Sequence, residues 1–100
     1  MTIADLLAQG GRPLFSFEFF PPKDDQGAEQ LWRTIKLLQP LAPDFVSVTY
    51  GANGSTRQRT LDVTARLARE TTLRTMGHLT CASQPVAELR ATIARYGADG

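Results

Sequence analysis

Apolar and polar residues alternate with a period of two in three short stretches of this chain, and apolar residues at helical spacing follow each stretch. The alternating stretches are Phe15–Phe20, Phe45–Tyr50 and Thr75–Cys81. Such alternation is typical of β-strands with one buried face, whereas apolar residues three or four positions apart indicate amphipathic helices. The helical stretches cover residues 28–38, 55–69 and 86–96. The pattern therefore predicts the order strand, helix, strand, helix, strand, helix.

Prolines and glycines favour the same boundaries. Pro21 and Pro22 end the first strand because proline cannot donate to a sheet ladder. A polar loop over 23–27 then leads to the first of the three helices, which Pro40 stops. Gly97 is typical of the residue just beyond a helix and marks the end of the last one.

Capping residues indicate two further helix starts. Thr2 and Asp5 have the spacing of a capping box, which predicts a short N-terminal helix that ends at Gly10. A frayed terminus is the alternative. Ser55 and Gln58 have the same spacing and predict the start of the helix that follows the second strand.

The strands recur with a period close to thirty residues. Glu18 and Thr49 are 31 positions apart, and Thr49 and His78 are 29 positions apart. Repeats of this length are typical of βαβ units, whose right-handed crossovers place the strands parallel and the helices outside. We therefore predict an α/β fold with one parallel sheet and no domain boundary within residues 1–100.

Glu18 is the carboxylate of the aromatic segment Phe15–Phe20. Apolar surroundings disfavour a charged carboxylate, so we expect a raised pKa and a carboxyl group that can donate a proton near neutral pH. Its place near the carboxyl end of a strand is where parallel α/β proteins have their chemistry. The structural alternatives are an edge-strand charge that discourages aggregation and one half of an ion pair.

Each strand carries a polar residue close to its carboxyl end: Glu18 on the first, Thr49 on the second, and His78 with Thr80 on the third. Parallel strands in register would bring these side chains to one rim. His78 is either a hydrogen-bonded packing residue or a ligand contact at that rim. The loop 51–54 contains glycine and can let a ligand approach backbone N–H groups, although neither phosphate-binding fingerprint is present.

Composition narrows the classes of function. The 11 basic and 10 acidic residues are interspersed and give a net charge of +1, which does not indicate nucleic-acid or membrane-surface binding. The apolar runs are shorter than the ~20 residues of a membrane span, and Asp5 argues against a signal peptide. The single cysteine, Cys81, favours a reducing cytoplasm, and one Cys with one His indicates no metal site. Cys81 and Trp32 are interpreted as packing residues.

Three motifs stand at matching intervals along the chain: Phe17–Pro22, Ser47–Ala52 and His78–Cys81. Together they resemble the methylenetetrahydrofolate reductase family, over almost the whole chain from Phe15 to Tyr96. The resemblance implies a flavoenzyme on a (β/α)₈ TIM barrel, with FAD bound at the carboxyl ends of the strands. It also implies that NADH or NADPH reduces the flavin, which then passes a hydride to 5,10-methylenetetrahydrofolate. The product, 5-methyltetrahydrofolate, serves one-carbon metabolism and methionine synthesis.

The resemblance also implies roles for single residues. Glu18 matches the family's general acid, which protonates the folate so that its five-membered ring opens to an iminium able to accept hydride. Thr49, Tyr50, Ala52 and His78 match cofactor-binding positions. Thr49 would offer a hydroxyl near the isoalloxazine, Tyr50 and Ala52 would line the cofactor wall, and His78 would hydrogen-bond to the cofactor. A cytoplasmic homo-oligomer with a small-molecule folate substrate is expected.

Three βα units supply fewer than half the strands of an eight-stranded barrel. We therefore interpret the sequence as the amino-terminal part of one TIM-barrel domain, whose catalysis requires the remaining strands. The alternative is a non-catalytic, truncated α/β module that self-associates or needs a partner to cover its sheet edges. A different barrel enzyme that uses the same rim for another cofactor is a third possibility.

Overall fold

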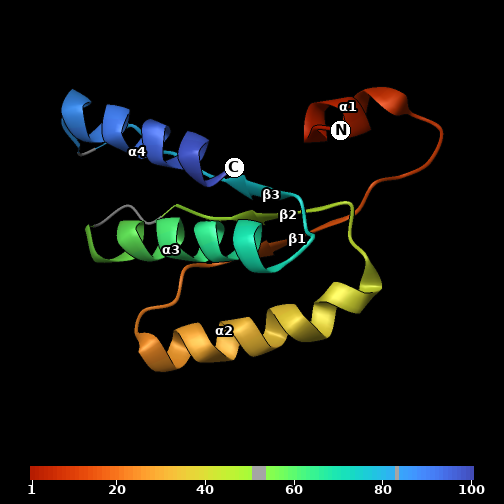
Figure 1. Ribbon diagram of the computed structural model, residues 1–100, viewed down its shortest axis with the longest axis horizontal. Helices are drawn as coiled ribbons and strands as arrows, with labels where there is room; N and C mark the ends of the chain where they lie inside the picture. Colours follow the sequence, from red (N-terminus) through yellow and green to blue (C-terminus); the bar gives the residue numbers. More distant parts are fainter. Residues whose placement is uncertain (51–53, 83) are drawn as a thin grey trace.

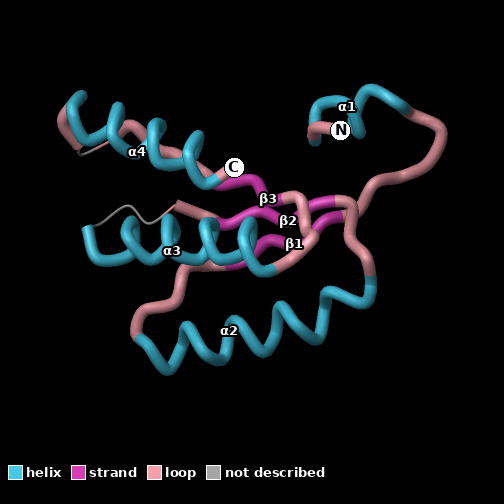
Figure 2. Tube along the Cα trace, in the orientation of Figure 1, coloured by secondary structure: helices cyan, strands magenta, loops and turns pink. Residues whose placement is uncertain are grey.

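Three strands form one parallel sheet in chain order in the computed structural model, which describes residues 1–50, 54–82 and 84–100 (Figures 1 and 2). The strands are β1 (Ser16–Phe19), β2 (Phe45–Val48) and β3 (Thr75–Gly77). The central strand, β2, pairs in parallel with β1 on one side and with β3 on the other. The predicted α/β class is confirmed, and consecutive βα units in this order are the arrangement from which a TIM barrel is built.

Four α-helices and one 3₁₀ helix accompany the sheet in the described part of the chain. They are α1 (Ile3–Gln9), α2 (Asp25–Leu38), η1 (Gln39–Leu41), α3 (Gly54–Glu70) and α4 (Val86–Asp99). Figure 1 shows α2, α3 and α4 grouped around the sheet, while an extended segment connects α1 to β1. None of the helices within the described ranges is long and apolar enough to cross a membrane.

The hydrophobic core lies between one face of the sheet and the helices α2 and α3. Its buried members are Phe19, Ile35, Val46, Val48 and Leu67. Burying a side chain of this size stabilises the fold by roughly 1.5–3 kcal/mol. Trp32 is partly buried and packs against this cluster, which confirms that it is a packing residue.

The first predicted helix boundary is partly wrong. Helix α2 starts at Asp25, three residues earlier than expected, because the carboxylate of Asp24 caps it and accepts a hydrogen bond from the backbone N–H of Gly27 at 2.7 Å. Its end at Leu38 is as predicted, and Pro40 lies in the 3₁₀ turn that follows.

The last strand and the last helix also differ from the prediction. Strand β3 stops at Gly77, because β2 has already ended at the residue that pairs with it. Cys81 therefore lies outside the sheet and is exposed, so its interpretation as a packing residue is wrong. Helix α4 passes through Gly97 and ends at Asp99, where an ion pair of 3.4 Å with Arg95 supports the last turn.

The predicted N-terminal capping box is confirmed. Thr2 Oγ1 accepts a hydrogen bond from the backbone N–H of Asp5 at 3.1 Å, and the Asp5 carboxylate accepts one from the N–H of Thr2 at 2.9 Å. These two bonds lower the pKa of Asp5, the backbone one most. At the next predicted capping pair, the side chain of Ser55 lies outside the described residues.

An ion pair joins the segments that enter β1 and β2. The guanidinium of Arg12 lies 3.1 and 2.5 Å from the two carboxylate oxygens of Asp44. The carboxylate of Asp44 also accepts a hydrogen bond from the backbone N–H of Phe15 at 3.0 Å. The hydrogen bond from Arg12, and after it the one from Phe15, lowers the pKa of Asp44. Both strands are thereby fixed at their amino ends, opposite the predicted rim.

Candidate functional site

The register of the sheet decides which polar side chains meet. Glu18 pairs with Ser47, and Ser47 pairs with Met76 on the next strand. Because side chains alternate along a strand, Glu18 and Ser47 share the face opposite the core. His78 lies on the same face by this alternation, one residue beyond the end of β3.

Three polar groups converge at this point. Ser47 Oγ donates a hydrogen bond to Glu18 Oε1 at 3.0 Å, and His78 Nε2 lies 3.5 Å from the same oxygen. Ser47 is buried, whereas the side chains of Glu18 and His78 are 51% and 38% exposed. The pair of Glu18 and His78 is the ion pair considered as a structural alternative, and it forms when the imidazole is protonated. Chemically, a carboxyl group and an imidazole that reach solvent can exchange protons with a bound molecule.

The apolar surroundings predicted for Glu18 are not observed. Phe17 and Phe19 turn to the core side of the sheet, away from the carboxylate. Phe15 and Phe20 are 52% and 74% exposed. The prediction of apolar surroundings for Glu18 is wrong because α2 and α3 pack on the opposite face of the sheet, the one that carries Phe19.

Ser47 is the member of this cluster that sequence reasoning missed. The sequence pattern favours Thr49 on β2, because Thr49 stands nearer to the end of the strand. In the structure, Glu18 pairs with Ser47, two residues earlier. The signal was present as a separation of 29 positions between Glu18 and Ser47, equal to that between Thr49 and His78.

The other predicted cofactor-binding residues that the structure describes lie outside the cluster of Glu18, Ser47 and His78. Thr49 directly follows β2, and its N–H donates to the carbonyl of Phe19 at 3.0 Å. Tyr50 lines a cavity of about 450 Å³ between α3 and α4, where its phenol oxygen accepts a hydrogen bond from Gln84 Nε2 at 3.1 Å. Ala52 lies outside the described residues. The structure thus brings Glu18 and His78 together and turns Tyr50 towards the helices.

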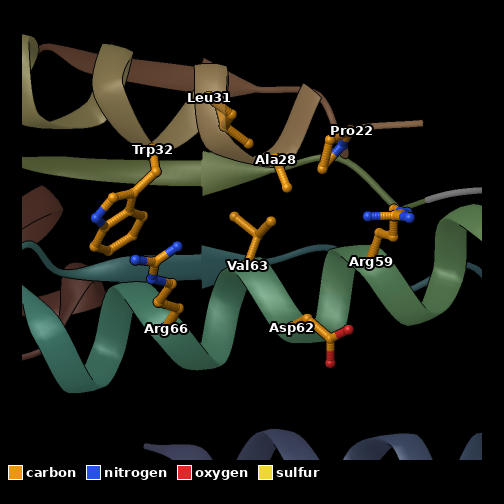
Figure 3. A pocket seen from close by; sticks show the side chains of 8 residues that line it. All are labelled: Pro22, Ala28, Leu31, Trp32, Arg59, Asp62, Val63 and Arg66. Atoms are coloured by element: carbon orange, nitrogen blue, oxygen red, sulfur yellow. The ribbon is translucent and has the colours of Figure 1, made fainter. Parts of the chain in front are cut away.

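A smaller cavity of about 170 Å³ lies between α2 and α3, away from Glu18. Figure 3 shows Trp32 projecting from α2 towards Arg66 of α3, and the guanidinium carbon of Arg66 is 3.8 Å from the ring centroid. Arg66 also pairs with Glu70 at 2.7 Å. These contacts are those of a cation–π pair at a helix interface, so we assign the cavity to helix packing.

The fold and the rim define the class of this protein. Consecutive parallel βα units carry an acid, a hydroxyl and an imidazole on one face near the strand ends, as in enzymes of the TIM-barrel type. The sequence model of one family, described as methylenetetrahydrofolate reductase, matches residues 2–100. The chain belongs to the methylenetetrahydrofolate reductase family, which confirms the resemblance noted from its motifs.

Individual relatives agree with this assignment. The 5,10-methylenetetrahydrofolate reductase of Salmonella typhimurium is 49% identical over 80 residues, which are 80% of this chain and 27% of that protein. The protein of the same name from Escherichia coli is 48% identical over the same shares of both chains. Methylenetetrahydrofolate reductase (NADH) 1 of Arabidopsis thaliana is 39% identical over 83% of this chain and 14% of its own length. The chain thus spans less than a third of each of these relatives.

Proposed function

We propose that this chain is part of the catalytic barrel of an oxidoreductase that reduces 5,10-methylenetetrahydrofolate to 5-methyltetrahydrofolate with electrons from NADH or NADPH. The observation that carries the proposal is the convergence of Ser47 and His78 on one oxygen of Glu18, in a chain that matches the family over residues 2–100. The name of the Arabidopsis thaliana relative specifies NADH, which supports a nicotinamide donor. We place the protein in the cytoplasm as a homo-oligomer.

FAD is the cofactor that we propose for the rim. When bound, it supplies hydride transfer between the nicotinamide and the folate. The chemistry of the described residues fits such a group, because cofactor sites combine apolar and aromatic side chains with a few polar groups that fix the orientation of the ligand. Phe20 is largely exposed on the face of Glu18, and the imidazole of His78 reaches solvent 3.5 Å from the carboxylate of Glu18. Thr49 and His78 would hydrogen-bond to the cofactor and Ala52 would line it, whereas Tyr50, whose phenol bonds to Gln84 between α3 and α4, would not.

Glu18 has the role of proton donor to the bound folate. The hydroxyl of Ser47 donates to Oε1 of Glu18, so this oxygen already accepts a hydrogen bond. A proton carried by the carboxyl group therefore resides on the other oxygen, Oε2. Ser47 comes from the central strand and is buried, so it holds the carboxyl group in one orientation. His78, at 3.5 Å from Oε1, is placed to stabilise the carboxylate that remains after proton transfer.

Glu18→Gln in a barrel completed with the remaining strands tests this role. We expect folate reduction to fall by about 10²- to 10⁴-fold, the usual contribution of a general acid. Oxidation of NADH or NADPH by another electron acceptor should survive, because that half-reaction does not use the acid. Glu29→Gln, at an exposed position of α2, is the matched control. Loss of both half-reactions in a folded Glu18→Gln protein would contradict the assignment.

The open face of the sheet favours a second candidate function, a non-catalytic module that self-associates or binds a partner. Exposed aromatic surface next to a sheet edge promotes association, and Phe15 and Phe20 are both exposed. Sedimentation equilibrium of the 100-residue chain tests the self-association that the second candidate requires. A stable monomer would exclude self-association.

A further inference from the structure

Two hydroxyl groups of the outer helices donate hydrogen bonds to the backbone at the predicted rim. Thr60 Oγ1 of α3 donates to the carbonyl of Thr49 at 2.9 Å. Tyr96 Oη of α4 donates to the carbonyl of His78 at 2.8 Å. Thr49 and His78 are the residues that directly follow β2 and β3. Each hydroxyl therefore acts where the sheet ladder stops and a cofactor-binding side chain is proposed.

The bond from Thr60 replaces a donor that the sheet cannot provide. Thr49 donates its N–H to the carbonyl of Phe19. In a parallel ladder, the carbonyl of Thr49 would accept from the residue two positions beyond Phe19, which is Pro21. Proline has no N–H, so this ladder bond cannot form. Thr60, whose exposure is 0%, supplies the donor from the helix side of the sheet.

The bond from Tyr96 depends on a close approach of α4 to β3. A Cβ atom built on Gly77 would lie 2.6 Å from Cε1 of Tyr96, so the ring occupies the space that a side chain would take. Burial raises the pKa of Tyr96 to about 12, and the phenol therefore stays protonated and able to donate at neutral pH. The ring of Tyr96 is thus held in position by its packing against Gly77, the last residue of β3.

We propose that Thr60 and Tyr96 are positioning residues for the cofactor-binding rim. By holding the carbonyls of Thr49 and His78, they fix the backbone at both positions and with it the directions of the two side chains. The inference rests on the proposed function, in which Thr49 and His78 contact the cofactor. Thr60 and Tyr96 act from the helix layer and through the backbone.

Variants that remove only a hydroxyl test the proposal. Thr60→Val and Tyr96→Phe keep the shape of the side chain. Thr71→Val is the matched control, because Thr71 directly follows α3 and its hydroxyl donates to the carbonyl of Leu67, the last-turn residue of that helix, at 2.7 Å. Far-UV circular dichroism verifies that each variant folds.

Two measurements separate positioning from a general loss of structure. Three-bond NMR couplings report the χ1 rotamers of Thr49 and His78, and we expect rotamer averaging of Thr49 in Thr60→Val and of His78 in Tyr96→Phe. Titration with FAD, followed by flavin fluorescence, should show about fivefold weaker binding in each variant, which corresponds to one lost hydrogen bond. Thr60→Ser, which retains the hydroxyl, should restore both the couplings and the affinity.

The outcomes show whether Thr60 and Tyr96 position the side chains of Thr49 and His78. Unchanged couplings in both variants overturn the proposal. Changed couplings with an FAD affinity equal to that of Thr71→Val overturn the link between positioning and the cofactor. The FAD titration uses the barrel completed with the remaining strands. If that parent protein binds no FAD, the proposed cofactor is wrong, and the couplings alone show whether the two hydroxyls position Thr49 and His78. Should Tyr96→Phe not fold, Thr60→Val and Thr60→Ser carry the test.

Discussion

Ser47 donates its hydroxyl hydrogen to Oε1 of Glu18 across 3.0 Å, from the central strand of the sheet to its neighbour. The donor is buried and belongs to a strand that is paired on both sides. The acceptor is half exposed. Ser47 is therefore the fixed partner, and the orientation of the Glu18 carboxyl group depends on it.

Removing the hydroxyl of Ser47 should slow folate reduction. We expect Ser47→Ala to lower kcat by about tenfold, the effect of one hydrogen bond to a charged group. Ser47→Thr keeps a hydroxyl and should restore most of the rate. Ser16→Ala is the control, since Ser16 is exposed and lies on the same face of β1. Equal rates for Ser47→Ala and the parent, in steady-state assays of a completed barrel, would show that the carboxyl group needs no such anchor.

Two glycine substitutions should change stability in opposite directions. In Gly77→Ala the new Cβ would lie 2.6 Å from the ring of Tyr96, and overpacking of this kind costs about 1–3 kcal/mol of unfolding free energy. In Gly97→Ala the Cβ would have no heavy atom of the described residues within 4 Å. Because Gly97 lies inside α4, this variant should gain roughly 0.5–1 kcal/mol. Urea unfolding measures both, and a stabilised Gly77→Ala would contradict the close packing of Tyr96.

Stability should depend on pH through Asp44. Its pKa is lowered in the folded state, first by the hydrogen bond from Arg12 and then by the N–H of Phe15. The stabilisation is therefore fully present above the unfolded value, about 3.9 for an aspartate, and is lost as the pH falls through the folded value.

Arg12→Ala tests this dependence. The variant should be less stable than the parent at pH 7, and the difference should shrink as the pH falls below about 4. Arg33→Ala, at an exposed position of α2, controls for loss of one positive charge. The measurement is the unfolding free energy between pH 7 and pH 2. A deficit of equal size across this range would show that the ion pair is not its source.

The phenol of Tyr96 should ionise at a higher pH than an ordinary tyrosine. Burial is the main cause that raises its pKa to about 12, from an ordinary value near 10. Because the folded pKa lies above the unfolded one, the associated stabilisation is present below pH 10 and disappears as the pH rises through 12. The difference in absorbance at 295 nm between the parent and Tyr96→Phe isolates the titration of Tyr96. A midpoint near 10 would indicate a solvated phenol.

Much of the architecture was predictable from local patterns. The alternation in Phe15–Phe20 and Phe45–Tyr50 located two strands and their buried faces, because the side-chain period of a strand belongs to the backbone itself. The capping box of Thr2 and Asp5 was predictable for the same reason, since its partners are three residues apart. Trp32 was assigned to packing from helical spacing alone.

Boundaries that depend on a partner were less predictable. The period-two pattern of Thr75–Cys81 continues past Gly77, but a strand exists only where a neighbour pairs with it, and β2 ends at Val48. Helix α2 begins three residues before the predicted start, because the carboxylate of Asp24 accepts a hydrogen bond from the backbone N–H of Gly27 in the first turn. Both outcomes depend on hydrogen bonds that apolar periodicity does not report.

The order of elements, the parallel α/β class and the polar character of one sheet face follow from spacing along the chain, because spacing is a local property of the backbone. Tertiary structure alone decided that Ser47, rather than Thr49, meets Glu18, and that Glu18 is exposed. It also decided that Thr60 and Tyr96 reach the ends of β2 and β3. These contacts depend on strand register and on the distance between helix and sheet, which core packing sets across residues far apart in the sequence.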